Sequence, residues 1–125
     1  MIRYDSIQYE PPAPIADIEI SNPVTHQAEA GLAKIDSGAD ISIIPAVWVM
    51  KLRLVPAGFS EVASFNGTLT EIPAYYVNIS MNGFNFEYVR VLSSNRTNAL
   101  IGRDILNQLK VTLDGKALKI QVLDP

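Results

Sequence analysis

The chain has 125 residues, of which 48% are hydrophobic, so it can form one domain with a modest core. The absence of cysteine excludes a disulfide framework and a thiolate zinc site. A formal net charge of −3, with scattered basic residues, gives no electrostatic footprint for nucleic acid. No apolar run reaches the ~18 residues of a membrane span, and the first residues lack the apolar core of a secretory signal. We therefore expect no membrane association and a cytoplasmic location.

The N-terminal residues 1–14 are polar and end in Pro11-Pro12-Ala13-Pro14, which favours an extended, weakly structured arm. A single domain over residues 15–125 is expected to follow. Within it, Ile15 to Ile20 alternates between apolar and acidic residues, as a half-buried strand does. After a turn at Ser21-Asn22-Pro23, a second strand is predicted from about Thr25 to Ile35.

The second strand leads into a stretch where an acid interrupts an apolar sequence. Asp36 follows Ile35 directly, Ser37 and Gly38 form a turn, and the sequence becomes apolar again from Ile41. An acid at the end of a buried strand is costly unless it is hydrogen-bonded, which favours a functional role. The alternative is an ordinary turn, because Asp, Ser and Gly each favour turns.

A short helix is predicted from Pro45 to about Leu52, since proline suits the first helical position. We expect Trp48 and Met50 in this helix to pack in the core.

The rest of the chain has β character. Three dipeptides lie between apolar-rich segments and suit two-residue hairpins: Asn66-Gly67, Asn82-Gly83 and Asp114-Gly115. Many short strands with one short helix after the turn and one near the C-terminus predict an all-β fold, a small closed β-barrel.

A second motif runs from Asn98 to Leu106. Its apolar strand ends at Gly102, and a helix with Ile105, Leu106 and Leu109 at helical spacing begins at once.

Together, the two motifs resemble those of the retropepsins, the retroviral-type aspartic proteases, over about Ile15 to Asp114. In that family an Asp-Ser/Thr-Gly-Ala turn supplies the catalytic acid, and an apolar-apolar-Gly-Arg-Asp/Asn-apolar-Leu segment supports it. The resemblance implies that Asp36 is catalytic. It implies that the turn is supported by three of its own residues and three of the second motif: Ser37, Gly38 and Ala39, and Leu100, Ile101 and Gly102.

The resemblance also assigns roles to neighbouring residues. The hydroxyl of Ser37 would bond across a dimer, and Asp40 would pair with Arg103. We expect that pair to be buried; the alternative is a surface ion pair contributing about 0–1 kcal/mol. The hairpin Ser64, Phe65, Asn66 and Gly67 would be the tip of a flap over substrate, although viral flaps contain more glycine. The alternative is an ordinary surface hairpin.

The implied activity is that of an aspartic endopeptidase acting on a peptide or protein substrate. One acid cannot both activate water and polarise the scissile carbonyl, so two copies of Asp36 would meet on the two-fold axis of a homodimer. The competing function is a non-catalytic homodimeric peptide-binding module, against which an intact Asp36 weighs. No cofactor or metal is expected, because the sequence has no phosphate loop and no metal-ligand spacing. The single histidine, His26, is expected on the surface.

The C-terminus departs from the viral pattern. Viral enzymes end just after the strand corresponding to Val111–Leu113, whereas this chain continues into a further apolar segment, Leu118 to Leu123. This looks more like the retroviral-protease-like domain of ubiquitin shuttle receptors. We therefore expect C-terminal hairpins at the dimer interface, with residues 1–14 as the other candidate.

Overall fold

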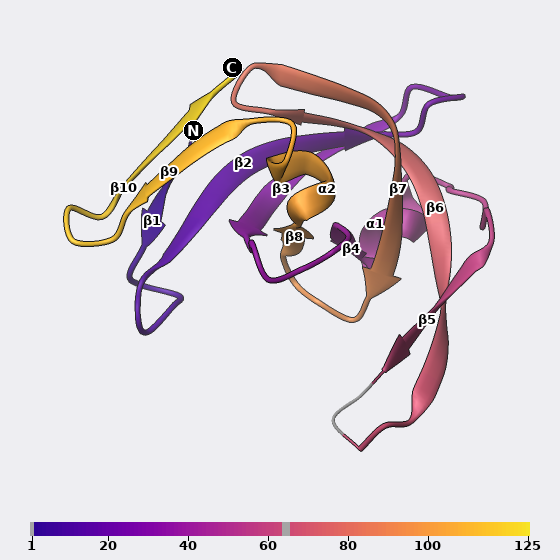
Figure 1. Cartoon of the computed structure of the whole chain (residues 1–125). Helices are drawn as coiled ribbons and strands as arrows, with labels where there is room; N and C mark the ends of the chain where they lie inside the picture. Colours follow the sequence, from indigo (N-terminus) through magenta and orange to yellow (C-terminus); the bar gives the residue numbers. More distant parts are fainter. Residues whose placement is uncertain (1, 64–65) are drawn as a thin grey trace.

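The computed structural model describes residues 2–63 and 66–125. Strands dominate, with a short helix in each half of the chain (Figure 1). In chain order the elements are β1 (Ile2–Asp5), β2 (Ala13–Ser21), β3 (Ala28–Ile35), β4 (Ile43–Pro45), α1 (Ala46–Lys51), β5 (Phe59–Ala63), β6 (Leu69–Met81), β7 (Phe84–Ser94), β8 (Ala99–Ile101), α2 (Arg103–Leu106), β9 (Lys110–Asp114) and β10 (Lys119–Leu123).

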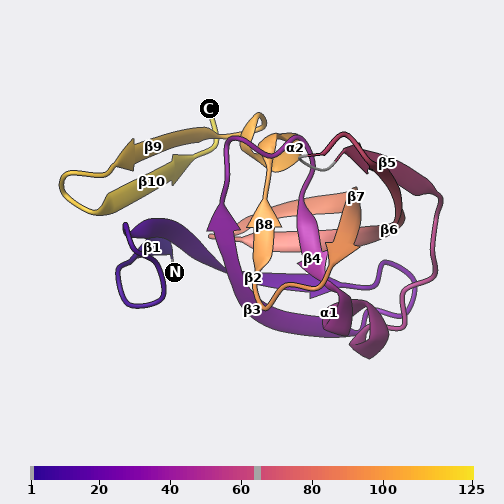
Figure 2. The same ribbon diagram turned by 90° about the horizontal axis from the view of Figure 1, so that it is seen from below.

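The main sheet closes on itself. Its strands follow the order β1-β2-β3-β8-β4-β7-β6-β5, and β2 also pairs with β6. The closed ring therefore consists of β2, β3, β8, β4, β7 and β6. β8 pairs in parallel with β3, and β4 pairs in parallel with β7 (Figure 2). The predicted small closed β-barrel is therefore confirmed.

The core fills the inside of this ring. Strand periodicity places alternate residues of β2 inward, so Ile18 and Ile20 are buried while Asp17 and Glu19 are exposed. Trp48 of α1 packs against β3 at Gly31, where a Cβ would lie 2.2 Å from the indole ring. The expectation for Trp48 is confirmed. That for Met50 is wrong, because its side chain points outward from the short helix and is 79% exposed.

One of the three predicted two-residue hairpins is confirmed. Met81 pairs with Phe84, and Asn82 and Gly83 both have positive φ, as this turn requires. The connection at Asp114-Gly115 is longer, because the pairing stops earlier: Asp114 pairs with Lys119 around residues 115–118. At Asn66-Gly67 the described pairing of β5 and β6 reaches Ala63↔Leu69, and the two-residue turn stays a prediction because Ser64 and Phe65 lie outside the described residues.

The first and last strands of the chain, β1 and β10, contact each other. The expectation of a weakly structured arm over residues 1–14 is wrong, since β1 pairs antiparallel with β2 from Ile2↔Ala16 to Asp5↔Ala13. β9 and β10 form a separate two-stranded sheet, which contacts β1 through β10.

In the described part of the chain, neither helix is long and apolar enough to cross a membrane.

Candidate active site

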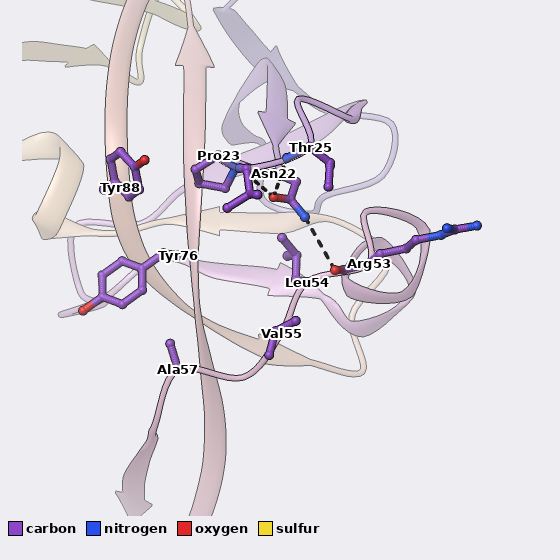
Figure 3. Close-up of a pocket in the computed structure, with 10 residues that line it drawn as sticks. Asn22, Pro23, Thr25, Arg53, Leu54, Val55, Ala57, Tyr76 and Tyr88 are labelled. Carbon is purple, nitrogen blue, oxygen red and sulfur yellow. Dashed lines mark hydrogen bonds between the residues drawn. The ribbon is translucent and has the colours of Figure 1, made fainter.

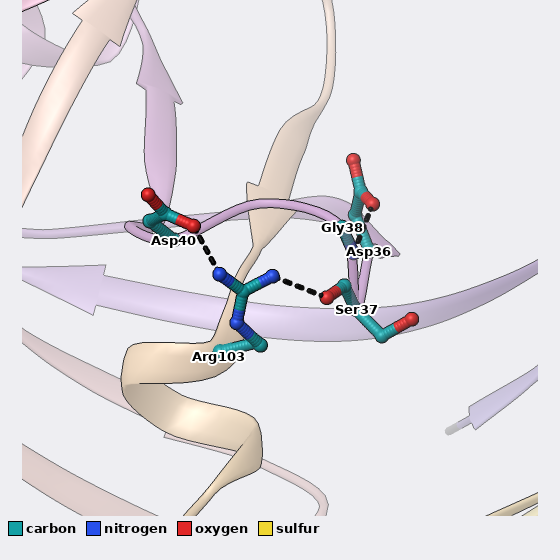
Figure 4. A network of polar contacts seen from close by, with 5 residues as sticks. All are labelled: Asp36, Ser37, Gly38, Asp40 and Arg103. Carbon is teal, nitrogen blue, oxygen red and sulfur yellow. Dashed lines mark hydrogen bonds and ion pairs between the residues drawn. The ribbon is translucent and has the colours of Figure 1, made fainter.

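Asp36 lies where β3 ends, at the open end of the parallel pair that β3 makes with β8. Its backbone N–H donates to the carbonyl of Ile101 (2.9 Å), which continues the β3–β8 ladder by one residue. The chain then turns back on itself: the N–H of Ala39 donates to the carbonyl of Asp36 (3.2 Å). The N–H of Gly38 donates to Oδ1 of Asp36 (2.9 Å), which fixes the half-buried carboxylate over the turn (Figure 4).

Gly102 allows the second motif to approach this turn closely. A Cβ at Gly102 would lie 2.8 Å from the carbonyl oxygen of Ala39 and 3.0 Å from the carbonyl carbon of Ile41. Both neighbours are backbone atoms, so they cannot move aside as a flexible side chain would. Directly after Gly102, the N–H of Arg103 donates to the carbonyl of Ala39 (2.9 Å). Glycine is needed here for proximity, because its φ of −96° suits any residue.

Arg103 holds the turn from its other side (Figure 4). One guanidinium nitrogen donates to the backbone carbonyl of Ser37 (2.8 Å), and the other contacts the carboxylate of Asp40. The side chain of Asp40 is 85% exposed and that of Arg103 is 43% exposed. The pair thus forms within one chain, but the expectation that it is buried is wrong for the single chain, where the pair lies at the surface. The hydroxyl of Ser37 is exposed, and its bond across a dimer stays a prediction.

Sequence reasoning missed a buried polar link between Ser42 and Asp104. Ser42 is 1% exposed, and its hydroxyl donates to Oδ1 of Asp104 (2.7 Å) while accepting from the N–H of Gly102 (3.0 Å). The N–H of Ser42 donates to the other carboxylate oxygen of Asp104 (2.9 Å). A serine inside the apolar run from Ile41 to Ile44 is the signal in the sequence, but its partner lies 62 residues away.

A groove of about 480 Å³ begins beside the turn. One wall comes from the turn and the start of β4, and the other comes from β5, with Leu92 between them. Its lining consists of Gly38, Ala39, Asp40, Ile41, Ile43, Ser60, Glu61, Val62, Ala63 and Leu92. β5 therefore lies across an open, largely apolar groove from the turn that carries Asp36.

The hairpin of β5 and β6 extends beyond the barrel (Figure 1). Ser64 and Phe65, half of the expected flap tip, lie outside the described residues. Asn66 and Gly67 are exposed, and the side chain of Asn66 accepts from the N–H of Thr68 (3.0 Å). The flap role stays a prediction, to which the position of β5 along the groove lends support.

A second pocket, of about 380 Å³, lies elsewhere on the barrel (Figure 3). It is bordered by the segment after α1 and by two tyrosines of β6 and β7, Tyr76 and Tyr88. No residue of the Asp36 turn lines it.

His26 is exposed, as expected. Among the described residues, no group of three or more His, Cys, Asp or Glu side chains is arranged to hold a metal ion.

The sequence matches no protein-family model and no curated protein. Solved structures, in contrast, match over most of the chain. The protease of EIAV, solved with the inhibitor HBY-793, is 20% identical with a TM-score of 0.56, and the match covers 82% of this chain and 90% of that one. The foamy viral protease-reverse transcriptase, solved with an RNA/DNA hybrid, is 18% identical with a TM-score of 0.57. That match covers 77% of this chain and 12% of the viral chain.

The chain therefore has a retropepsin-like fold, the fold of the retroviral proteases. At this level of identity the likeness concerns the fold, and the chemistry rests on the residues described above.

Proposed function

We propose that this protein is an aspartic endopeptidase, in which a homodimer brings two copies of Asp36 together to hydrolyse peptide bonds. The observation that carries the proposal is the Asp36 turn, which residues of the second motif hold by hydrogen bonds on both sides. Ile101 accepts from the N–H of Asp36, and Arg103 donates to the carbonyls of Ala39 and Ser37. A turn held at so many points can keep a carboxylate in a reactive geometry beside the groove.

The chemistry requires two carboxyl groups in different protonation states. One carboxylate takes a proton from the attacking water, and the protonated partner donates a hydrogen bond to the scissile carbonyl. Two carboxyl groups at contact distance share one proton because both cannot stay charged, which is the general behaviour of aspartic-protease dyads. A tetrahedral intermediate then forms, and its collapse, with a proton given to the amine, breaks the C–N bond.

One chain supplies one such acid on such a turn, so a symmetric dimer is the economical solution. The turn suits this arrangement because Ser37 and Asp40, on either side of Gly38, are exposed in the single chain. A peptide substrate would lie in the groove between the turn and β5. The apolar lining of Ile41, Ile43 and Val62 favours apolar side chains there.

The first test replaces the proposed nucleophile-activating acid. Asp36→Asn should abolish cleavage of a peptide library, because an amide cannot take a proton from the attacking water as a carboxylate does. The fold and the dimer should persist, because the amide is nearly isosteric with the carboxyl group. The matched control is Asp17→Asn, the same chemical change at an exposed position on β2, which should cleave as the wild type does.

The pH dependence of the wild type provides a second readout. Cleavage needs one proton on the dyad, so the rate should fall when rising pH removes that proton and again when strong acid protonates both carboxyl groups. Near wild-type cleavage by Asp36→Asn would reduce Asp36 to a structural turn residue. Peptide binding without cleavage in the wild type would instead support the non-catalytic binding module.

A further inference from the structure

Arg90 of β7 contacts the base of the β5–β6 hairpin from two strands away. β6 lies between β7 and β5 in the sheet, so β7 and β5 are separated by about twice the ~4.8 Å strand spacing. The Arg90 guanidinium reaches β5 from this distance. One nitrogen donates to the hydroxyl of Ser60 (3.0 Å), and another donates to the backbone carbonyl of Phe59 (3.2 Å).

The point of contact is where the hairpin leaves the barrel. β6 pairs with β7 from Ala74 onward and with β5 up to Pro73, so the junction lies between these two residues. Gly58, directly before β5, has a φ of +99°, a conformation suited to glycine. Two backbone bonds fasten this segment: Ala57 N–H to the carbonyl of Ala74 (2.8 Å), and Ala74 N–H to that of Gly58 (2.9 Å).

Beyond this junction β5 has few other attachments. Within the described part of the chain it is an edge strand that pairs with β6 alone, and its residues from Glu61 to Ala63 are exposed. Glu61 also stands directly opposite Glu71 on β6, a like-charge pair that weakens the ribbon. Among the described residues, the first residues of β5 are therefore linked to the barrel by side-chain hydrogen bonds from Arg90.

Ser60 belongs to the groove as well as to this contact. It lines the groove together with Gly38 and Ala39 of the Asp36 turn, while its hydroxyl accepts from Arg90. We propose that Arg90 is a positioning residue, which sets the β5 wall of the substrate groove against the Asp36 turn. The proposal rests on the proposed peptidase function for its catalytic consequence, but not for the contact itself.

The nature of the side chain follows from this geometry. A guanidinium offers several donors in one plane, so it can serve the Ser60 hydroxyl and the Phe59 carbonyl at the same time. Arg90→Lys can reach one acceptor but not hold both in a fixed geometry. It should therefore restore part of what Arg90→Ala loses.

The primary test is amide hydrogen exchange, which needs no activity. In Arg90→Ala, exchange at residues 59–63 should accelerate roughly tenfold, as expected for the loss of a charge-assisted hydrogen bond. Exchange in β2 and β3 should stay unchanged, and Arg90→Lys should be intermediate. Arg96→Ala is the matched control, since that arginine donates to the carbonyl of Asn98 within its own loop. Unchanged exchange in β5, or equal acceleration in β2 and β3, would overturn the proposal.

The kinetic test separates positioning from chemistry. A loosened groove wall must be ordered when the peptide binds, so Arg90→Ala should raise KM by roughly tenfold and leave kcat within about threefold. A fall in kcat at constant KM would contradict a positioning role. If the wild-type protein cleaves no peptide, the proposed function fails while the exchange experiment still decides the role of Arg90. If the wild type cleaves and β5 exchange does not respond, the inference about Arg90 fails alone.

Discussion

Gly102 shows at the scale of one residue how the second motif holds the first. Gly102→Ala should destabilise the fold by about 1–3 kcal/mol, because the new methyl group would overlap the backbone of Ala39 and Ile41. Urea denaturation measures this cost. Gly115→Ala is the matched control, since its nearest atom would be the Tyr4 hydroxyl at 3.8 Å, an ordinary contact. A Gly102→Ala protein as stable as the control would mean that the turn can move away without loss.

A double-mutant cycle measures how much Arg103 and Asp40 each contribute to stability and how strongly the two are coupled. Asp40→Ala should cost less than about 1 kcal/mol, because the carboxylate is mostly exposed. Arg103→Ala should cost more, roughly 1–2 kcal/mol, because it also removes the bond to the Ser37 carbonyl. The coupling between the two should stay below about 1 kcal/mol. A coupling of about 3 kcal/mol or more would mean that dimerisation buries the pair.

The residues of the candidate active site could be predicted from the sequence because they lie close together in two short segments of the chain. Asp36, Ser37 and Gly38 form one turn, and Gly102 and Arg103 form one strand-to-helix junction. The solvent exposure of individual side chains could not be predicted from the sequence in the same way. Sequence spacing cannot reveal how much solvent reaches Asp40, and the outward direction of Met50 depends on where a short helix meets the barrel.

At the scale of elements, Ser42 and Asp104 connect the start of β4 to α2. Ser42→Ala should cost about 1–3 kcal/mol, because it leaves the buried N–H of Gly102 without its acceptor and removes a bond to Asp104. Ser94→Ala is a suitable control, since the buried Ser94 hydroxyl has no hydrogen-bond partner among the described residues. The control should be neutral or slightly stabilising in thermal melts. Equal losses from both variants would show that the Ser42 link contributes little.

Hairpins show which elements a local pattern can predict. Asn82-Gly83 forms the expected two-residue turn because the pairing of β6 and β7 continues to its edge. Around Asp114-Gly115 the pairing ends earlier and four residues make the connection, with positive φ at Leu118. The same dipeptide signal therefore gives different turns, because strand register is decided by packing across the sheet. β1 was not predicted for the same reason. Ile2–Asp5 forms a strand because it pairs with β2, and the sequence of this segment does not indicate that pairing.

At the scale of the whole molecule, the C-terminal sheet has an apolar face that is only partly covered. Cross-strand partners share a face, so Val111, Leu113, Ile120 and Val122 lie together on one side of β9 and β10. Val122 is buried and Ile120 packs against the barrel core, whereas Leu113 on β9 is 47% exposed. A two-stranded sheet is marginal by itself, and its edges are open to pairing. Within the proposed homodimer, the exposed part of this face at Leu113 is the expected contact with the second copy.

A single charge on this face should therefore weaken the dimer without opening the core. Leu113→Lys should raise the dimer dissociation constant about tenfold or more, because it removes buried apolar area and places a cation in the interface. Thr112→Lys is the matched control, as the neighbouring side chain is exposed on the opposite face of β9. Sedimentation at micromolar concentrations measures both variants, and circular dichroism confirms that they fold. If peptide cleavage follows the dimer population, Leu113→Lys should lose activity at low protein concentration and regain it at high concentration. Equal dissociation constants for the two variants would move the interface to another surface.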